Sequence, residues 1–239
     1  MQRHSKRIAS WEIYSSLKTR APLVARADGR GFKKLLSNCK KPYDIDFARS
    51  MSSAAQDIFS DSGLMPLLAY IFSDEINLVY LEAPMAGRVE KIDSLVAGFL
   101  SSVLSLNLGR QVSMDCRIIS LSLAEIVDYF VERQEEAWRN HVFSWGFYML
   151  IEEGFCPAGA MDVLRGMKDN EIHEQAFQKG VNLARTPLWE RRGVMVYRKD
   201  GLVVQNWELP LFNSLEGKHF IGEILTSSLP KSPKSSAPE

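Results

Sequence analysis

The chain is poor in cysteine, has no excess of charge of either sign and contains no long apolar run. Its three cysteines are scattered over 239 residues without metal-site spacing, and this sparse, odd number favours a reducing compartment and buried thiols. Lysine plus arginine and aspartate plus glutamate each total 29, so a surface for a polyanion would have to be a local patch. The most apolar stretch, residues 92–108, is too short and too polar to span a bilayer. These absences predict a cytoplasmic protein.

Other common signals are also missing. The basic N-terminus is not followed by an apolar segment, so it does not read as a secretion signal. His173 and His219 have no partners at the spacing of a zinc site. Gly29 and Gly31 are spaced neither as a dinucleotide fingerprint nor as a Walker loop, although glycines there would let the backbone approach a phosphate closely.

The first half of the chain contains the hydrophobic patterns of four strands and two helices. Strands are predicted at residues 22–27, 67–72, 76–81 and 115–121, and helices at 45–60 and 85–108. The order strand, helix, strand, strand, helix, strand is that of the split βαβ unit. The sequence therefore predicts an α+β fold with a ferredoxin-like (βαββαβ) sheet.

The second half is predicted to be mostly helical. Ser122 and Glu125 form a capping box, so a helix begins there, and helical character continues to about residue 153 with a bend. Shorter helices are predicted near 160–167 and 170–179, and Thr186 with Pro187 suits a further helix start. Strands at 194–198 and 202–207 form a second hairpin, and the Ser- and Pro-rich tail from residue 227 is expected to be disordered.

Two short acidic motifs lie where predicted strands end. They read RADGRGF at residues 26–32 and FSDE at residues 72–75. In a split βαβ sheet the first and third strands are antiparallel neighbours about 4.8 Å apart, so Asp28 and Asp74 should meet at one edge. Two such carboxylates repel unless a cation lies between them, and oxygen ligands with phosphate favour Mg²⁺ over zinc. A pair of these ions would serve phosphoryl or nucleotidyl transfer, whereas each motif alone is also a common polar turn.

At these motifs the sequence resembles the tRNA-His guanylyltransferase family, and more closely its archaeal-type Thg1-like members. Both acidic motifs match, as do residues 41–42, 91, 114–117, 133–134, 138–141, 168–173 and 191–193, in the family's order. The resemblance implies a palm-type catalytic sheet that works in the 3′–5′ direction. It implies addition of GMP or other nucleotides to the 5′ end of tRNA, with GTP and ATP as substrates and two Mg²⁺ ions. The 5′ end is activated with ATP or already carries a triphosphate.

The resemblance also implies roles for individual residues. Asp28, Asp74 and the Gly29 carbonyl would hold the metals, and Glu75 would support these catalytic carboxylates. Nucleotide binding would use Arg26, Gly29, Arg30, Gly31, Phe32, Lys33, Lys41, Ser73 and Lys91, with backbone amides contributed at positions 30–32. The residues expected to contact tRNA are Arg133, Arg139, Asn140, His141, Arg191 and Arg192. The alternatives are solvated helix faces for the arginines and an interhelical hydrogen bond for His141.

One segment departs from the eukaryotic family pattern. Residues 138–144 read WRNHVFS, and of the family's tRNA-recognition segment only Asn140 is retained in place. This change fits family members that repair 5′-truncated tRNAs by templated addition, but strict specificity for tRNA-His stays open as well, because both activities share the same chemistry. The resemblance further implies a homotetramer built as a dimer of dimers. A nucleotide cyclase-like signalling domain and a non-catalytic RNA-binding protein remain the competing interpretations.

The expected organisation has three parts. Residues 1–121 form the palm-like catalytic core. Residues 122–226 form an extension of C-terminal helices and a hairpin packed on the same domain. Residues 227–239 form the disordered tail.

Overall fold

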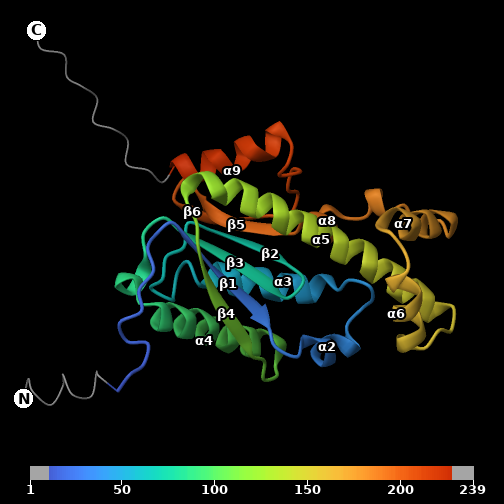
Figure 1. Cartoon of the computed structure of the whole chain (residues 1–239), viewed down its shortest axis with the longest axis horizontal. Helices are drawn as coiled ribbons and strands as arrows, with labels where there is room; N and C mark the ends of the chain where they lie inside the picture. The colour runs from blue at the N-terminus through green and yellow to red at the C-terminus, as the bar shows by residue number, and fades with distance from the viewer. Residues whose placement is uncertain (1–10, 228–239) are drawn as a thin grey trace, which may run out of the picture.

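A six-stranded antiparallel sheet organises the part of the chain that the computed structural model describes, residues 11–227 (Figure 1). Its strands are β1 (Leu23–Gly29), β2 (Leu68–Phe72), β3 (Glu75–Tyr80), β4 (Met114–Ser120), β5 (Val194–Lys199) and β6 (Leu202–Asn206). They lie in the order β4-β1-β3-β2-β5-β6. The first four, with the helices between them, make the ferredoxin-like unit, so the predicted α+β topology is confirmed.

The second hairpin belongs to the same sheet. Strand β5 pairs with β2, with Val194 opposite Ile71 and Tyr197 opposite Leu68. Strands β2 and β3 consist almost entirely of buried residues, because other parts of the molecule cover both of their faces. Strand β4 lies at one edge and alternates buried or half-buried with exposed residues over much of its length.

Long helices cover the two faces of the sheet: α3 (Ile45–Asp57), α4 (Val89–Leu108), α5 (Leu123–Glu152) and α9 (Leu215–Ser227). Helices α3 and α4 cover one face, where Met51 and Leu100 share a core with Leu78. Helices α5 and α9 cover the other face, where Phe130 and Ile221 share a core with Tyr70. The sheet is thus the middle layer of three, as Figure 1 shows.

The structure differs from the sequence prediction at three helices. Helix α4 begins at Val89 rather than at residue 85, because Met85 and Ala86 have φ angles of 52° and 54° in a separate turn. Helix α5 has the predicted capping box, in which Glu125 accepts the Ser122 N–H at 2.7 Å, but it continues as one helix of 30 residues. Helix α9 was not predicted, although Ile221, Ile224 and Leu225 have helical spacing.

The last turns of α5 carry a small helical lobe, visible at the right of Figure 1. It contains α6 (Pro157–Arg165) and α7 (Asp169–Gln178). Gly146 lets α5 and α7 approach closely, since a Cβ atom there would lie 2.6 Å from Cγ2 of Ile172. The lobe has its own core, so α5 connects the sheet to a second packing centre.

Short elements complete the chain: α2 (Phe32–Leu35), α8 (Leu188–Arg192) and 3₁₀ turns at Leu36–Asn38, Pro84–Gly87 and Leu183–Arg185. Helix α8 starts after Pro187, so the predicted start at Thr186 was wrong; the Thr186 hydroxyl donates to the Leu183 carbonyl instead. In the stretch 11–227 no helix combines the length and apolarity needed to cross a membrane. The predicted tail lies outside the described residues apart from Ser227.

Candidate active site

Asp28, Gly29 and Asp74 meet at one edge of the sheet, as the predicted topology requires. The Gly29 N–H donates to the Asp74 carbonyl at 3.1 Å, which fastens the end of β1 to the β2–β3 turn. A Cβ atom on Gly29 would lie 2.8 Å from Oδ2 of Asp74 and 2.6 Å from the Phe32 ring, so the Asp74 carboxylate rests against the glycine backbone. Ser73 turns the hairpin with φ of 51°, and its hydroxyl donates to Oδ1 of Asp74 at 3.0 Å.

Carboxylates line up across three strands at this edge. Asp28 is directly opposite Glu75 on β3 and Asp115 on β4. Residues opposite one another in antiparallel strands project from the same face, so these three carboxylates form an acidic row beside Asp74. Burial raises the pKa of Asp74, and the charge of Asp28 raises it further. The edge therefore holds more negative charge than its own side chains neutralise.

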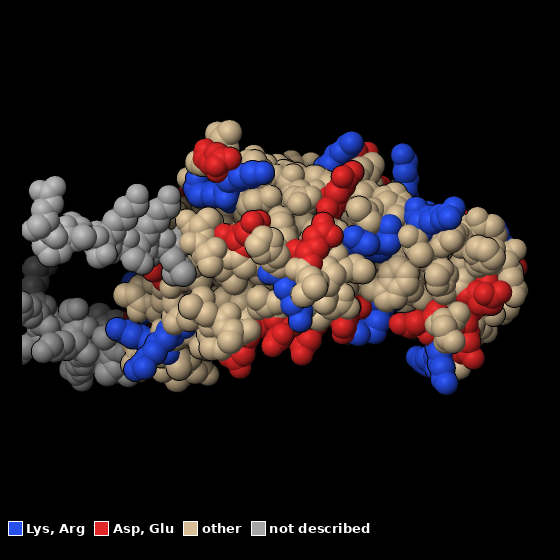
Figure 2. Space-filling view, turned by 90° about the horizontal axis from the view of Figure 1, so that it is seen from above, with Lys and Arg blue, Asp and Glu red and all other residues tan. Residues whose placement is uncertain are grey.

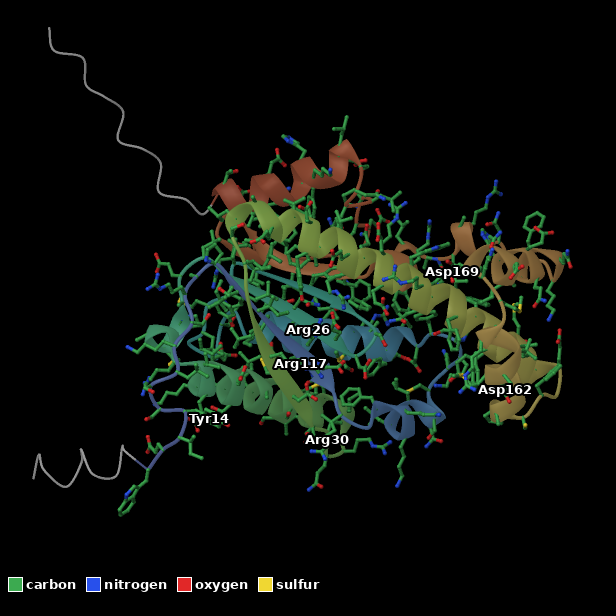
Figure 3. All side chains as sticks on the ribbon, viewed as in Figure 1. Tyr14, Arg26, Arg30, Arg117, Asp162 and Asp169 are labelled. Carbon is green, nitrogen blue, oxygen red and sulfur yellow. The ribbon has the colours of Figure 1, made fainter. Side chains whose placement is uncertain are left out.

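A row of cations lies directly behind the acidic row. Arg26 is opposite Arg117 on β4 and Asn77 on β3. Figure 3 shows Arg26 and Arg117 on these neighbouring strands, with Arg30 beyond the end of β1. Arg117 is exposed and lies 3.9 Å from Asp115, measured from Nε to Oδ1. Arg26 is half-buried, and a cationic strip such as Arg26 and Arg117 beside carboxylates is suited to a polyphosphate.

Glu75 is held by a buried network rather than left free. Its Oε1 accepts from Nδ2 of Asn77 at 2.8 Å, and its Oε2 lies 3.5 Å from Nη1 of Arg133. The hydroxyl of Tyr129 donates to Oδ1 of Asn77 at 2.5 Å, which fixes the amide orientation. Burial raises the pKa of Glu75, while Asn77, Arg133 and Arg26 act in the opposite direction.

The edge fits a hard divalent cation that keeps water and phosphate ligands. Within residues 11–227 no three Asp, Glu, His or Cys side chains converge as a metal-binding cluster. A metal here would therefore take the Asp28 and Asp74 carboxylates, a backbone oxygen and ligands from outside the protein. Mg²⁺ is usually bound in this way, by one or two carboxylates together with substrate phosphates. The raised pKa of Asp74 fits as well, because a cation would relieve the repulsion from Asp28.

The loop after β1 supports the expected phosphate contacts only in part. Gly31 has φ of 73° and caps α2. The Phe32 side chain is buried against Phe47, with ring centroids 6.1 Å apart. The Arg30 N–H donates to the Ser113 carbonyl at 2.8 Å, so this amide already has a partner within the fold. The side chains of Arg30 and Lys33 remain exposed.

A pocket of about 180 Å³ opens beside the carboxylate edge, between α3 and α5. We call it the α3–α5 pocket. Ser73 of the β2–β3 turn lines it, and its wall includes Tyr43 and Trp189, whose ring centroids are 6.0 Å apart. Lys41 lines it, donates from Nζ to the Leu36 carbonyl at 2.6 Å and lies 5.2 Å from the Tyr148 ring centroid. A flat ring system could lie against these aromatic groups while its substituents reach the edge.

Lys91 is the one predicted nucleotide-binding residue that the fold places away from the carboxylates. Strand β3 leads from Glu75, opposite Asp28, to Tyr80, opposite Leu23, and Lys91 follows in the first turn of α4. It is exposed at the far end of the strands. Any contact it makes would therefore be with a distant part of a bound substrate.

The residues expected to contact tRNA do not form one surface. Arg133 is turned inward to Glu75, with 19% of its side chain exposed. Arg139 is exposed and paired with Glu136 at 2.6 Å. Asn140 lines the α3–α5 pocket. Figure 2 shows Lys and Arg interspersed with Asp and Glu on the α5 and α9 side, so no patch of one sign covers that face.

The fold buries His141, which corrects its expected role, whereas Arg191 and Arg192 are half-buried and remain candidates for tRNA contacts. His141 is 0% exposed, so it cannot touch RNA in this conformation, and its Nε2 lies 3.0 Å from Oγ1 of Thr186. Arg191 donates from Nε to the Thr186 carbonyl at 3.1 Å, and Arg192 from Nη1 to the Leu209 carbonyl at 2.8 Å. His141 therefore makes a hydrogen bond within the fold, to Thr186 in the segment that precedes α8.

Sequence reasoning missed several residues around the site. Asn77 could have been found, because a lone amide inside an apolar strand usually has a polar partner. Tyr43, Trp189 and Glu190 carried no signal of their own, since they meet only where α8 packs beside the end of β2. The register adds Arg117 to the site, opposite Arg26.

The comparisons with known proteins agree with this arrangement. The sequence model of the Thg1 family, described as tRNAHis guanylyltransferase, matches residues 5–131, more than half of the chain. The tRNA(His) guanylyltransferase 1 of Arabidopsis thaliana is 26% identical over 210 residues, which make up 80% of this chain and 36% of that protein.

Two solved structures share the fold. A bacterial Thg1-like protein in complex with ATP matches 92% of this chain and 98% of its own, with a TM-score of 0.78 and 20% identity. A bacterial Thg1-like protein in complex with GTP matches 93% of this chain and 99% of its own, with a TM-score of 0.71 and 18% identity. The fold and the family match together show that this chain belongs to the Thg1 family of tRNAHis guanylyltransferases.

Proposed function

We propose that this protein adds nucleotides to the 5′ end of tRNA in the 3′–5′ direction. The observation that carries the proposal is the junction of Asp28, Gly29 and Asp74 beside the cationic strip of Arg26 and Arg117. The chain spans 36% of the length of the Arabidopsis relative, so activity, substrates and partners are all part of the proposal. The 5′ ends of truncated tRNAs are proposed as substrates together with that of tRNA-His, because residues 138–144 depart from the eukaryotic pattern.

The residues divide the chemistry between them. Asp28 and Asp74, with the Gly29 carbonyl, would hold two Mg²⁺ ions, which when bound would neutralise phosphate oxygens at the reacting centre. Glu75, held by Asn77 and Arg133, keeps the edge acidic and rigid. Arg26 and Arg117 bind phosphates behind it, and the α3–α5 pocket takes a purine base.

The transfer step itself needs no covalent enzyme intermediate. The 3′-hydroxyl of GTP attacks the activated 5′ phosphate of the tRNA, forming a P–O bond. Pyrophosphate leaves when the 5′ end is a triphosphate, and AMP leaves when it has been adenylylated with ATP. Positioning and charge neutralisation supply the rate in such reactions.

A 5′-extension assay tests the proposal. The purified chain is incubated with Mg²⁺, ATP and GTP and a panel of mature and 5′-shortened tRNAs, and 5′-end length is resolved on gels. Lengthened tRNA with the parent chain, and none with Asp28→Ala, would support it. No extension of any tRNA would overturn it, and cyclic GMP formed from GTP without RNA would favour the cyclase alternative.

We also propose the homotetramer as the assembly that binds tRNA. The formal charge of the chain is zero, so cationic strips from several copies would add to the attraction for RNA. Light scattering during size exclusion, at low and high salt, gives the mass directly. A monomer under both conditions would overturn this part of the proposal without affecting the chemistry.

A further inference from the structure

A second hollow, of about 340 Å³, lies beside the carboxylate edge, where β1 ends and β4 begins. We call it the α2–α4 hollow, because α2 and the loop that follows α4 form its two sides, and Figure 1 shows these segments next to each other. Arg30, Lys34 and Arg110 line it together with Ser113, and none of the acidic residues in the stretch 11–227 does. It begins one residue beyond Gly29, the last residue of β1, so it borders the edge.

The three cations of the α2–α4 hollow lack partners inside the protein. They are exposed, and their side chains form no hydrogen bond or ion pair with any described residue. Exposed arginines on helices elsewhere are each paired with a carboxylate one turn away: Arg49 with Asp46, Arg139 with Glu136 and Arg165 with Asp162. The hollow therefore presents uncompensated positive charge in a chain whose formal net charge is zero.

The loop that carries Arg110 is held in a defined conformation. The Arg110 N–H donates to the Ser105 carbonyl at 3.1 Å, and the Ser105 hydroxyl oxygen accepts the Val112 N–H at 3.1 Å, so the loop is fastened to α4. On its other side, the hydrogen bond from the Arg30 N–H to the Ser113 carbonyl ties it to the end of β1. Such a preformed arrangement loses less conformational entropy when a ligand binds.

The lining of the hollow indicates a ligand with phosphates rather than a base. Among the described residues, Phe32 alone contributes a ring to the lining, and it is 3% exposed and packs on Phe47, so the hollow has no ring free for stacking. Guanidinium and ammonium groups that lack an acidic partner bind phosphate oxygens through charge-assisted hydrogen bonds. In the proposed function the nucleotide has its phosphates at the carboxylate edge, which leaves the hollow to the second substrate, the RNA chain.

We propose that Arg30, Lys34 and Arg110 bind backbone phosphates of the substrate RNA next to its reacting 5′ end. The inference rests on the proposed function, and it adds a place where the RNA chain is held. An RNA end that approaches Asp28 and Asp74 meets carboxylates that repel its phosphates, and three cations beside them reduce this repulsion. Because phosphates carry no sequence information, the hollow would hold different tRNAs equally well.

Equilibrium binding of tRNA without GTP and ATP, measured at several salt concentrations, tests the proposal. The double variant Lys34→Ala/Arg110→Ala removes two of the three cations and keeps Arg30, for which the family resemblance implies a contact with the nucleotide. Its affinity for tRNA should be lower by about tenfold or more at about 0.1 M salt. The slope of the logarithm of affinity against the logarithm of salt concentration should become shallower by about 1.5 to 2, the value for two lost phosphate contacts. The loss should be the same for tRNA-His and for unrelated tRNAs.

Lys199→Ala/Lys218→Ala is the matched control. It also removes two exposed cations without ion-pair partners among residues 11–227, one at the end of β5 and one on α9. It should keep the salt dependence of the parent chain. Both double variants should unfold at the same denaturant concentration as the parent, because exposed side chains without partners contribute little to stability. If the control lost as much salt dependence as the test variant, net charge rather than the hollow would be responsible, and the proposal would be overturned.

A measurement with nucleotide separates the hollow from the nucleotide site. In the 5′-extension assay the KM for tRNA should rise about tenfold in Lys34→Ala/Arg110→Ala, whereas the KM for GTP should not change. Weaker binding of GTP with Mg²⁺ by this variant would assign the hollow to nucleotide phosphates and overturn the proposal, as would an unchanged salt slope or a parent chain that binds no tRNA. A chain that binds tRNA through these residues but extends none refutes the proposed function alone. A chain that extends tRNA and keeps its salt slope in the variant refutes this inference alone.

Discussion

The sequence suggested functional roles for ionisable residues in two regions: the carboxylate edge around Asp28 and the buried aromatic cluster around His141, which we call the junction. The two regions differ in exposure and in how they treat charge. At the edge, burial and like charge raise the pKa of Asp74, and the surface beside it is open. At the junction, His141 is 0% exposed beside Trp138 and Tyr43, with ring centroids 5.6 Å and 5.3 Å away. The first region holds unfavourable negative charge that a ligand can relieve, whereas the second buries an imidazole whose Nδ1 atom has no hydrogen-bond partner within residues 11–227.

The largest effect should come from removing charge at the edge. Asp74→Asn is expected to lower 5′-extension by about 10³-fold or more, because the metal and phosphate lose a ligand. The same variant should be more stable without ligand, by about 0.5–2 kcal/mol, since the repulsion from Asp28 is gone. Denaturant melts with and without Mg²⁺ check this, and the parent chain alone should gain stability from the metal.

The sign of the pH dependence follows from the raised pKa of Asp74. The carboxyl costs no stability below its unfolded pKa, where it is protonated in both states, and the cost appears as pH rises through the folded pKa. The stability gap between Asp74→Asn and the parent should therefore widen with rising pH. If Asp74→Asn were less stable than the parent chain at neutral pH, repulsion between Asp28 and Asp74 would not be destabilising the parent.

The second effect comes from a substitution at the junction, and it should change folding stability without changing tRNA extension. His141→Ala removes a fully buried ring and its contact with Oγ1 of Thr186, and is expected to cost about 2–4 kcal/mol of unfolding free energy. The residual folded protein should still extend tRNA below its melting temperature. His219→Ala is the matched control, because 77% of that side chain is exposed and little stability should be lost. If a folded His141→Ala protein no longer bound tRNA, His141 would have to contribute to tRNA binding.

The third effect is a pH dependence of folding stability that comes from the junction and has the opposite sign to that of the edge. Burial lowers the pKa of His141 from its ordinary 6.5 to about 4. Below pH 6.5 the imidazole of His141 is protonated in the unfolded chain but stays neutral in the folded chain. The free energy of unfolding should therefore decrease as the pH falls from 6.5 to about 4, by at most about 3 kcal/mol. Urea titrations across this range should show the fall in the parent and a smaller one in His141→Asn. Parallel pH curves for the two proteins would rule out this histidine as the cause.

A fourth, intermediate effect tests the network that links the edge to α5. Asn77→Ala leaves Glu75 and the Tyr129 hydroxyl without their shared partner, and should cost about 1–3 kcal/mol of stability. Transfer should slow by about tenfold with the KM for GTP little changed, because Glu75 is displaced rather than removed. Asn77→Asp, which retains an acceptor for Tyr129 but repels Glu75, should be the more damaging of the two in rate. Equal rates in both variants would mean that this network does not set the position of Glu75.

The smallest effect is expected where a paired charge is exposed. Arg139→Ala breaks an ion pair with Glu136 in which half of the arginine side chain is accessible, and should change stability by less than about 0.5 kcal/mol. If Arg139 contacts tRNA, the variant should weaken tRNA binding moderately and reduce its salt dependence by about one phosphate contact. Binding measured at several salt concentrations decides this, and an unaltered slope would leave the arginine as a solvated helix residue.

Much of the fold could be predicted from local patterns, for reasons visible at individual residues. Alternating and continuous apolar runs predicted every strand to within two residues at each end, because strand faces repeat every second position. The capping box at Ser122 predicted the start of α5, since it relies on groups within one turn. The turn at Pro84 and the helix at Leu215 escaped notice, because positive φ at Met85 and packing against α5 are set by distant contacts.

The sequence by itself determined the class of site. Two acidic motifs at the ends of neighbouring strands were enough to place Asp28 and Asp74 together, because antiparallel pairing of the first and third strands allows no other arrangement of those ends. Their joint resemblance to one family then suggested the chemistry.

Only the tertiary structure decided which polar residues have partners and which are left for a ligand. The fold turned Arg133 toward Glu75 and buried His141, whereas it left Asp74 beside the like charge of Asp28. A side chain's identity states what it can donate or accept. Its burial and its neighbours, which come from elements far apart in the chain, decide whether that capacity is already used.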